Sequence, residues 1–378
     1  MSDAQGVRNV LIVGGGVGGM AAAIRLREAG INVDLVDIDP RWGVYGTGIT
    51  LSVLTLRALC DLGLAAEVMA EGNCYDGFTI CNSKGDILQQ IQSSRLYSQD
   101  VPAEGGILRP ALHAIMKKRV LASEARVRTG VTIEGLEQDA VKVLVPFTDG
   151  SSGEYDLLIG ADGLFSKVRG MIFPDAPKPK FTGQACWRVL FDIPQGWTCG
   201  RMFLGDKIKL GFTLCSPDKM YLYLLEHVPD NPWRDAKALP DLLRGLMDGF
   251  GGEAARLREM IDADTPIIYR PLESILLTET WSQGRVVLLG DAAHATTPHL
   301  GSGAGAAVED AIVLTEELVS SASIEEALVN FDRRRIPRAS LVVNNSLKIG
   351  ELEMNGGSMQ EQAVLIGVSM KAIAEAYR

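Results

Sequence analysis

The stretch Val10–Asp37, VLIVGGGVGGMAAAIRLREAGINVDLVD, decides the fold of this chain. It opens with a short apolar run that predicts a buried strand, and this strand leads directly into a Gly-x-Gly-x-x-Gly motif. Residues 20–29 have helical composition, Gly30 is a natural helix stop, and residues 31–36 give a second strand before Asp37. Strand, glycine motif, helix, strand and acid in this order predict a dinucleotide-binding unit.

The glycines of this motif have separate predicted tasks. Gly14 makes the tight turn, Gly16 lets the backbone approach a pyrophosphate, and Gly19 permits close packing of helix on strand. Asp37 stands where a ribose hydroxyl acceptor is expected. The residues predicted to bind the nucleotide here are Gly14, Gly16, Val17, Gly18, Gly19 and Asp37. The motif does not distinguish NAD from the ADP half of FAD.

A second stretch, Val286–Asp310, reads VVLLGDAAHATTPHLGSGAGAAVED and lies near the other end of the chain. Its apolar start predicts a strand that ends at Gly290-Asp291, and residues 306–318 predict a helix with acidic residues near its start. Strand, acidic turn, glycine loop and helix N-terminus together suit a polar, partly anionic planar ligand. An ordinary strand–loop–helix connection is the alternative.

Composition excludes several classes of protein. The 378 residues allow two domains, and 47% hydrophobic residues are typical of a globular protein. A net charge of −10 disfavours nucleic acid and anionic membranes as partners. The N-terminus has no basic region of a secretory signal, and no apolar run approaches the roughly 20 residues of a membrane span. Six scattered cysteines and four histidines predict reduced thiols, no metal site and a cytoplasmic location.

The strand pattern predicts a discontinuous organisation. Short strands between residues 77 and 91 and again between 186 and 225 indicate an antiparallel sheet inserted into the nucleotide unit. We therefore predict an α/β fold with a cleft between two domains. A Rossmann-like domain comprises residues 1–73, 95–180 and 266–378 and ends in a helical segment. A mostly antiparallel β-sheet substrate domain comprises 74–94 and 181–265.

Three further positions could reach the nucleotide. Arg41 precedes the glycine-containing loop Trp42–Leu51 and could contact adenosine or phosphates. Arg109 stands immediately before Pro110, at a predicted helix start, and could point at phosphate or ribityl oxygens. Asp162 ends another apolar strand, in the turn 160–163. Each has a structural alternative, which is a surface arginine for the first two and a structural ion pair with a nearby arginine for Asp162.

Three motifs together carry a resemblance: the first glycine motif with Asp37, Gly160-Ala161-Asp162-Gly163 with Arg169, and Gly290–His294 with Pro298. In this order they resemble the single-component FAD-dependent aromatic hydroxylases, the para-hydroxybenzoate and salicylate hydroxylase family of flavoprotein monooxygenases. The resemblance covers nearly the whole chain and implies FAD as cofactor, with NADH or NADPH as reductant. It also implies that a flavin C4a-hydroperoxide, formed with O₂, hydroxylates a small electron-rich substrate, either phenolic or a hydroxylated N-heteroaromatic.

The resemblance also implies roles for particular residues. Asp291 matches the aspartate that binds the ribityl chain of FAD, and Arg109 matches an arginine that contacts FAD. The positive end of the helix near Gly303 would stabilise the anionic edge of a reduced flavin. The further residues expected to bind the cofactor are Arg41, Gly48, Arg109, Val131, Asp162, Asp291, Pro298, Gly303, Ala304 and Gly305.

Residues that face the substrate should come from the inserted sheet and from the loop 46–50. Arg188 could hold a substrate anion or neighbour the flavin, and His299 stands where some relatives that act on hydroxypyridines carry histidine. Thr50 replaces the histidine base of several relatives, so the base is not assigned. The candidates for catalysis are Arg188, His299, Thr50, Tyr223 and Phe212, with Tyr221 as a further substrate-facing candidate.

Three rival functions remain open. An NAD-dependent dehydrogenase would use the first glycine motif but leave Gly290-Asp291 without a task. A non-catalytic FAD-binding regulator would keep both motifs. A flavin-dependent halogenase is disfavoured, because Trp187 is not part of a Trp-x-Trp-x-Ile-Pro run. The sequence does not reveal the substrate, the regiochemistry, the choice between NADH and NADPH, or whether the protein is a monomer or a homodimer.

Overall fold

The predicted dinucleotide-binding unit forms the centre of a six-stranded sheet. In the computed structural model, which describes residues 6–44, 46–205 and 208–377, β1 (Asn9–Val13) leads through the glycine loop into α1 (Val17–Glu28) and β2 (Asn32–Asp37). The strand order is β18-β19-β12-β1-β2-β8, with every pair parallel except β18–β19. The other strands are β8 (Arg126–Thr129), β12 (Leu157–Gly160), β18 (Ser282–Gln283) and β19 (Val286–Leu288). The predicted α/β class is confirmed.

Two sequence predictions rest partly on residues outside the described ranges. The expected absence of a secretory signal concerns residues 1–5, and the glycine-containing loop 42–51 includes residue 45.

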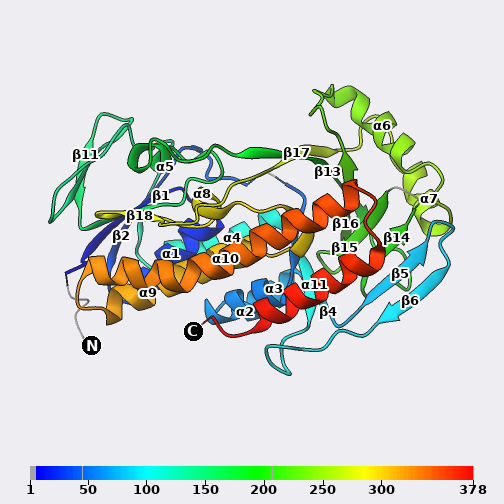
Figure 1. Cartoon of the computed structure of the whole chain (residues 1–378), viewed down its shortest axis with the longest axis horizontal. Helices are drawn as coiled ribbons and strands as arrows, with labels where there is room; N and C mark the ends of the chain where they lie inside the picture. Colours follow the sequence, from blue (N-terminus) through cyan, green and yellow to red (C-terminus); the bar gives the residue numbers. More distant parts are fainter. Residues whose placement is uncertain (1–5, 45, 206–207, 378) are drawn as a thin grey trace.

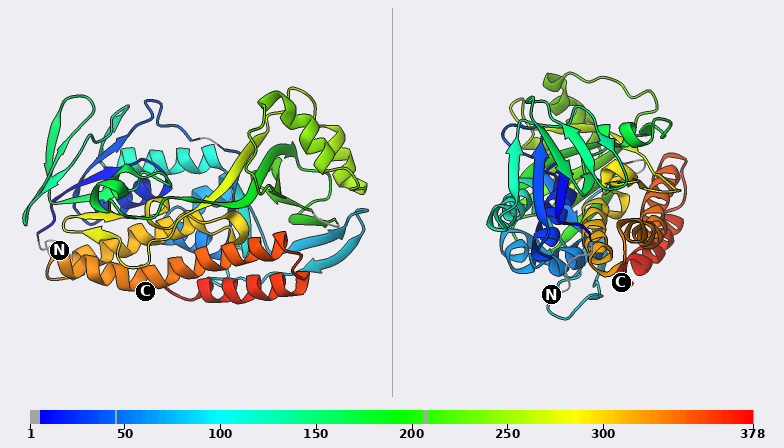
Figure 2. Two further views of the ribbon diagram at one scale, coloured as in Figure 1. Left: turned by 45° about the horizontal axis from the view of Figure 1, so that its top comes forward. Right: turned by 90° about the vertical axis from the view of Figure 1, so that its left-hand side faces the viewer.

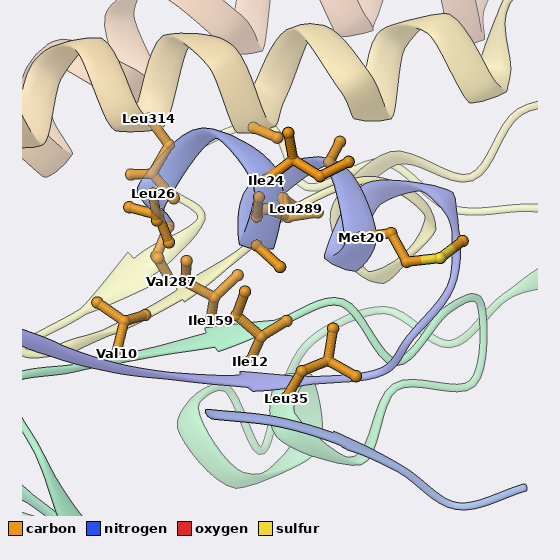
Figure 3. Close-up of a cluster of buried hydrophobic side chains, with 14 of the residues drawn as sticks. Val10, Ile12, Met20, Ile24, Leu26, Leu35, Ile159, Val287, Leu289 and Leu314 are labelled. Carbon is orange, nitrogen blue, oxygen red and sulfur yellow. The ribbon is translucent and has the colours of Figure 1, made fainter. Parts of the chain in front are cut away.

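Apolar side chains fasten the helices to this sheet. Figure 3 shows Met20, Ile24 and Leu26 of α1 above the strands, with Ile12 and Ile159 below them. All five side chains are fully buried. Burial of a side chain of this size contributes roughly 1.5–3 kcal/mol, so the packing of α1 on the sheet fixes where the glycine loop lies.

The inserted segments form one sheet of seven strands, ordered β17-β13-β16-β15-β14-β5-β6. The strands are β5 (Phe78–Asn82), β6 (Ile87–Ile91), β13 (Lys180–Asp192), β14 (Gly200–Leu204), β15 (Lys209–Leu214), β16 (Lys219–His227) and β17 (Ile268–Ser274). Only the β14–β5 pair among them is parallel. Because β17 pairs with β13, strand pairing extends the inserted sheet to Ser274, beyond the boundary at 265 expected from the sequence. Figure 1 shows this sheet at the opposite end of the molecule from β1, β2 and β11.

The two faces of the seven-stranded sheet differ in character. Side chains alternate along a strand, so Trp187, Phe212 and Leu222 point to one face and join a buried apolar cluster with α6 (Leu239–Leu246) and α7 (Gly252–Glu259). The sequence predicts that Phe212 faces the substrate. This prediction is wrong, because the position of Phe212 in β15 directs its ring into this core. Arg188 and Tyr223, which are paired in register, point to the other face.

Two small sheets and several helices complete the chain. One sheet has the order β3-β7-β4, with β3 (Gly48–Leu51), β7 (Glu104–Leu108) and β4 (Asn73–Tyr75). The other has the order β11-β10-β9, with β11 (Ser152–Tyr155), β10 (Val143–Pro146) and β9 (Glu137–Gln138). The remaining helices near the site are α2 (Val53–Asp61), α3 (Ala65–Glu71), α4 (Arg109–Ala122), α5 (Lys167–Ile172), α8 (Asp291–His294) and α9 (Gly303–Ser320).

The predicted C-terminal helical segment consists of α10 (Ile324–Met354) and α11 (Met359–Ala374). Both run along one side of the molecule, and α10 extends from the six-stranded sheet to the seven-stranded one (Figures 1 and 2). Of the helices formed by the described residues, none combines the length and the apolar character that crossing a membrane requires.

A buried ion-pair network fastens the second glycine stretch to these helices. Arg335 of α10 is fully buried and binds Glu309 at 2.8 Å and Asp310 at 2.7 Å, both on α9. Asp310 also accepts a hydrogen bond from the Gly290 amide at 2.9 Å and lies 2.6 Å from His294 Nε2. Burial alone would raise the pKa of Asp310, but His294 and Arg335 lower it to about 2. The sequence reading assigned these acids to the helix dipole, whereas the structure uses them as buried ion-pair partners.

We expect Arg335→Met to destabilise the protein by about 3–5 kcal/mol, because it leaves two buried carboxylates without their shared cation. Arg333→Met is the matched control, since Arg333 is exposed on the same helix. Urea denaturation of both variants measures the difference. Equal unfolding free energies would contradict the role given to the network.

Candidate active site

The glycines of the first loop serve two different purposes. Gly14 and Gly19 allow close packing of the main chain, whereas Gly16 leaves space for a ligand. A Cβ atom on Gly14 would lie 2.3 Å from the Ala161 carbonyl oxygen, and one on Gly19 would lie 1.9 Å from the Gly14 oxygen. Gly14 also has a φ of +106°, which favours glycine. A Cβ on Gly16 would meet no atom within 4 Å. Gly14 and Gly19 are thus required by the fold, while Gly16 faces open space, as a pyrophosphate-binding position should.

The helices that follow the two glycine stretches start without a side-chain cap. Ser52, Ser166, Ser323 and Ser358 accept hydrogen bonds at the starts of α2, α5, α10 and α11. By contrast, α1 begins at Gly16 and α9 at Ser302, and neither has a side-chain cap or an acidic residue in its first turn. Free amides at a helix N-terminus favour a bound anion, so both glycine stretches can serve one anionic ligand.

The end of β2 brings three predicted nucleotide-binding residues together. Asp37 Oδ2 accepts a hydrogen bond from the Gly15 amide at 2.7 Å, so the carboxylate lies against the glycine loop. The Val131 amide donates to the Asp37 carbonyl oxygen at 3.1 Å. Arg41 is exposed nearby, with its Nε 3.6 Å from Asp39. Trp42 is buried and donates from its indole to the Gly15 carbonyl at 2.9 Å, a contact that the sequence analysis missed.

The side chain of Asp162 has a structural role at the start of α5. Its carboxylate accepts hydrogen bonds from Ser166 Oγ at 2.5 Å and from the amides of Lys167 and Val168 at 2.7 and 3.1 Å, at the start of α5. Arg169 donates to the carbonyl of Ala292 at 2.8 Å, which links this turn to the second glycine stretch. A role of Asp162 toward FAD stays a prediction, and its side chain already has partners.

Asp291 lies in a recess. It begins α8, directly after Gly290 with φ +60°, and its side chain is exposed. Burial nevertheless raises its pKa, with Asp310 adding to the effect, while His294 and Arg109 act in the opposite direction. A carboxylate that is open to solvent yet close to much surrounding protein agrees with a ligand-binding position.

Two arginines near Asp291 form no ion pair with a described acidic residue. The guanidinium groups of Arg109 and Arg188 form no ion pair or hydrogen bond with any described residue, although both side chains are half-buried. Burial lowers the pKa of Arg109, the charge of Arg188 lowers it further, and Tyr221 and Asp291 raise it. We call Arg109, Arg188, Tyr221 and Asp291 the arginine cluster. The two cations outnumber the single carboxylate of Asp291 in this cluster, and this excess of positive charge favours a bound anion.

Glycines make room for the aromatic side chains beside this cluster. A Cβ on Gly48 would lie 2.3 Å from the ring of Tyr221, and one on Gly211 would lie 1.9 Å from the ring of Tyr223. Tyr221 Oη and Thr50 Oγ1 are 2.6 Å apart and share a hydrogen bond. Burial raises the pKa of both tyrosines, which keeps the phenols neutral. A glycine within a strand often marks a place where another group comes close to the main chain, so Gly211 could have predicted the position of the Tyr223 ring.

The structure brings Thr50, Arg188, Tyr221 and Tyr223 together, but it turns His299 toward the C-terminal helices. The imidazole is almost fully buried, with Nδ1 2.8 Å from Thr297 Oγ1 and Nε2 3.3 Å from Glu353 of α10. Glu353 also binds Lys209 at 2.7 Å. Contact between His299 and substrate therefore stays a prediction.

Packing between helices constrains the turn before α9 and the first turn of that helix. Pro298 begins a short 3₁₀ turn (Pro298–Leu300), and Gly303 and Ala304 form the first residues of α9. A Cβ on Gly305 would lie 2.2 Å from Leu54 of α2, so this glycine is required where the two helices touch. Ser52 and Ser302, at the starts of α2 and α9, are hydrogen-bonded at 3.0 Å.

Comparison with known proteins identifies the family to which the chain belongs. The family model described as "FAD binding domain" matches residues 8–346, which is most of the chain. The chain belongs to the FAD-dependent monooxygenase family. It is 33% identical to 2-heptyl-3-hydroxy-4(1H)-quinolone synthase of Pseudomonas aeruginosa, over 91% of this chain and 89% of that one. It is 30% identical to aurachin C monooxygenase/isomerase of Stigmatella aurantiaca, over 91% and 89%.

A solved structure extends the similarity to the fold. Klebsiella pneumoniae HpxO complexed with FAD and uric acid superimposes with a TM-score of 0.85 at 25% identity, over 98% of this chain and 94% of that one. The family assignment confirms the predicted resemblance, the FAD cofactor and an oxidoreductase activity. It leaves the dehydrogenase and regulator alternatives without support.

The residues of this flavoprotein fit FAD on structural grounds. Open space at Gly16 and the two uncapped helix starts suit the pyrophosphate and the flavin edge, and the recessed Asp291 suits a ribityl hydroxyl. Arg109 supplies a cation without a partner among the described residues. The individual contacts predicted between these residues and FAD stay predictions.

We expect Gly16→Val to leave the fold intact and to weaken FAD binding at least tenfold, because the added side chain enters only the open space that the pyrophosphate needs. Gly19→Val should instead unfold the nucleotide unit, since its Cβ would overlap the Gly14 carbonyl. Circular dichroism and the flavin absorbance of purified protein separate the two effects. Full flavin occupancy in Gly16→Val would show that the pyrophosphate lies elsewhere.

Proposed function

We propose that this flavoprotein hydroxylates a small oxygenated N-heteroaromatic ring in its anionic form, with NADH or NADPH as reductant and O₂ as oxidant. The observation that carries the proposal is the arginine cluster, in which Arg109 and Arg188 lie together and Asp291 is the acidic residue coupled to them. If one cation serves the cofactor, the other is available for a substrate anion. Two similar proteins are named for, or crystallised with, oxygenated N-heterocycles, namely the quinolone synthase and HpxO with uric acid.

Bound and reduced FAD would supply the activated oxygen, and the protein's residues would prepare the ring. Arg188 can pair with a ring oxygen or carboxylate, which favours the ionised and more electron-rich substrate. Tyr223 Oη has no hydrogen-bond partner among the described residues, and it can donate to a second polar atom of the ring. Tyr221 and Thr50 hold each other's hydroxyls in place at the cleft face of the sheet.

The absence of a base at Thr50 narrows the substrate class. A threonine hydroxyl does not accept a proton at neutral pH, so this position cannot deprotonate a weakly acidic phenol. Stabilisation of an anion by Arg188 suffices only where the ring hydroxyl or ring N–H ionises near neutral pH by itself. Hydroxylated N-heteroaromatic rings meet this condition better than simple phenols, and we therefore favour them as substrates.

We further propose that the protein acts in the cytoplasm on a free small molecule, as a monomer or a homodimer, without nucleic acid or membrane partners. A net charge of −10 and six cysteines without a disulfide support this setting.

The test of the function is a substrate panel. Purified protein should contain FAD, and an acidic hydroxylated N-heterocycle should accelerate NAD(P)H oxidation with one hydroxylated product formed per reductant consumed. Simple phenols should be poorer substrates at pH 7 than at a pH above their ring pKa. Oxidation that yields only hydrogen peroxide across the whole panel would reject the proposal.

Arg188→Gln should raise the substrate KM about ten- to a hundredfold, because a charge-assisted hydrogen bond contributes about 1.5–3 kcal/mol. Flavin content should fall much less. Arg270→Gln on the adjacent strand β17 is the control, since Arg270 is exposed. A substrate KM unchanged in Arg188→Gln, with FAD lost, would assign Arg188 to the cofactor.

A further inference from the structure

The last turn of α10 carries a carboxylate that binds two strands of the seven-stranded sheet (Figure 1). Glu353 accepts hydrogen bonds from Lys209 Nζ on β15 at 2.7 Å and from Gln184 Nε2 on β13 at 3.2 Å. The Nε2 atom of His299 lies 3.3 Å from the same carboxylate. Lys209 also donates to Gln362 of α11 at 2.6 Å. We call these five residues the Glu353 cluster.

The Glu353 cluster is largely shielded from water. The side chain of His299 is 2% exposed and that of Glu353 is 15% exposed, and both amide side chains are buried. Burial alone would raise the pKa of Glu353, but His299 and Lys209 lower it to about 2, so the carboxylate is an anion at neutral pH. Burial raises the pKa of Tyr223, and Glu353 is among the groups that add to this effect. The cluster therefore lies within electrostatic reach of the substrate-facing side chains.

Two members of the cluster belong to strands that carry these substrate-facing side chains. Gln184 lies on the same face of β13 as Arg188, four residues along the strand. Lys209 begins β15, two residues before Gly211, where the main chain lies against the ring of Tyr223. The carboxylate thus holds the sheet on which the proposed substrate site is built.

A third member connects the carboxylate to the turn before α9. His299 lies in the turn Pro298–Leu300, and its Nδ1 atom is 2.8 Å from Thr297 Oγ1. A Cβ on Gly350 would lie 2.8 Å from Gln184 Oε1 and 3.0 Å from His299 Cε1, so α10 packs directly against both side chains. The same end of α10 therefore contacts the turn and the sheet, and it sets the separation between them.

We propose that Glu353 is a positioning residue for hydroxylation, which fixes the turn before α9 relative to the substrate-facing sheet. This inference rests on the proposed function, in which the turn faces the flavin and the sheet faces the ring. The geometry between flavin and ring then depends on how these two elements are held together. A displacement on the order of 1 Å can slow a chemical step about a hundredfold. With the wrong spacing, NAD(P)H and O₂ should yield NAD(P)⁺ and hydrogen peroxide instead of a hydroxylated ring.

The test compares Glu353→Leu with Glu351→Leu, which makes the same change at an exposed position of α10. In Glu353→Leu the yield of hydroxylated product per NAD(P)H consumed should fall at least fivefold, and hydrogen peroxide should account for the difference. The substrate KM should change less than threefold, because Arg188 is retained. Glu351→Leu should match wild type in both quantities.

Two further variants show whether Glu353 acts through its partners. In Glu353→Gln the new amide oxygen can accept from Lys209, and its N–H group can donate to Gln184 Oε1, which is buried and has no partner among the described residues. This variant should recover at least half of the wild-type yield. His299→Leu should lose as much yield as Glu353→Leu, and the double variant should lose no more, because the two residues act as one unit.

A spectroscopic measurement separates positioning from stability. Bound substrate should perturb the visible absorption spectrum of oxidised FAD, and the amplitude at saturating substrate and equal flavin content should fall at least twofold in Glu353→Leu and in His299→Leu. Yield and amplitude equal to those of Glu351→Leu would overturn the inference, even with a lower melting temperature, since Glu353 would then only stabilise the fold. A wild type that hydroxylates no ring would instead reject the proposed function, and this inference with it.

Discussion

The position of the second glycine stretch depends on one buried cation. Arg335 reaches from α10 to two carboxylates on α9, and one of these carboxylates holds the Gly290 amide and His294. The turn that carries Asp291 is therefore tied to the C-terminal helices, through groups that water does not reach. Two more arginines, Arg57 and Arg338, bind the same Glu309 and also the last carbonyl groups of α11. The loop that is expected to face the ligand is rich in glycine and other small residues, and this network supports it from behind.

The two glycine stretches show what a sequence can and cannot predict. The order of strand, glycine motif, helix and acid in Val10–Asp37 is local, so both the elements and the packing roles of Gly14 and Gly19 follow from it. Residues 78–91 and 180–274 also join one sheet, much as the strand pattern indicates. Gly305 has a cause that no local pattern reveals, because the collision that excludes a side chain there comes from α2, about 250 residues earlier in the chain.

The sequence predicted some residues of the candidate site correctly and others not, because it shows local patterns but not contacts between distant segments. Arg109, Arg188 and Asp291 carry charges that a motif can suggest, and the fold brings them into electrostatic contact. The prediction for Phe212 was wrong because the alternation of side chains along a strand defines two faces without saying which one is buried. Only the register with β16 shows which face meets the core. His299 and Asp162 were chosen by residue type. Their partners, Glu353 and the start of α5, come from contacts that the sequence does not display.

The tyrosines beside the arginine cluster have a consequence for selectivity. Each ring lies directly against a glycine, so any side chain at Gly48 or Gly211 would displace the aromatic ring beside it. The two glycines therefore set how closely the aromatic wall approaches the main chain. A larger residue at either position would push a tyrosine into the space proposed for the substrate, so the room available to a ring depends in part on two residues that have no side chain.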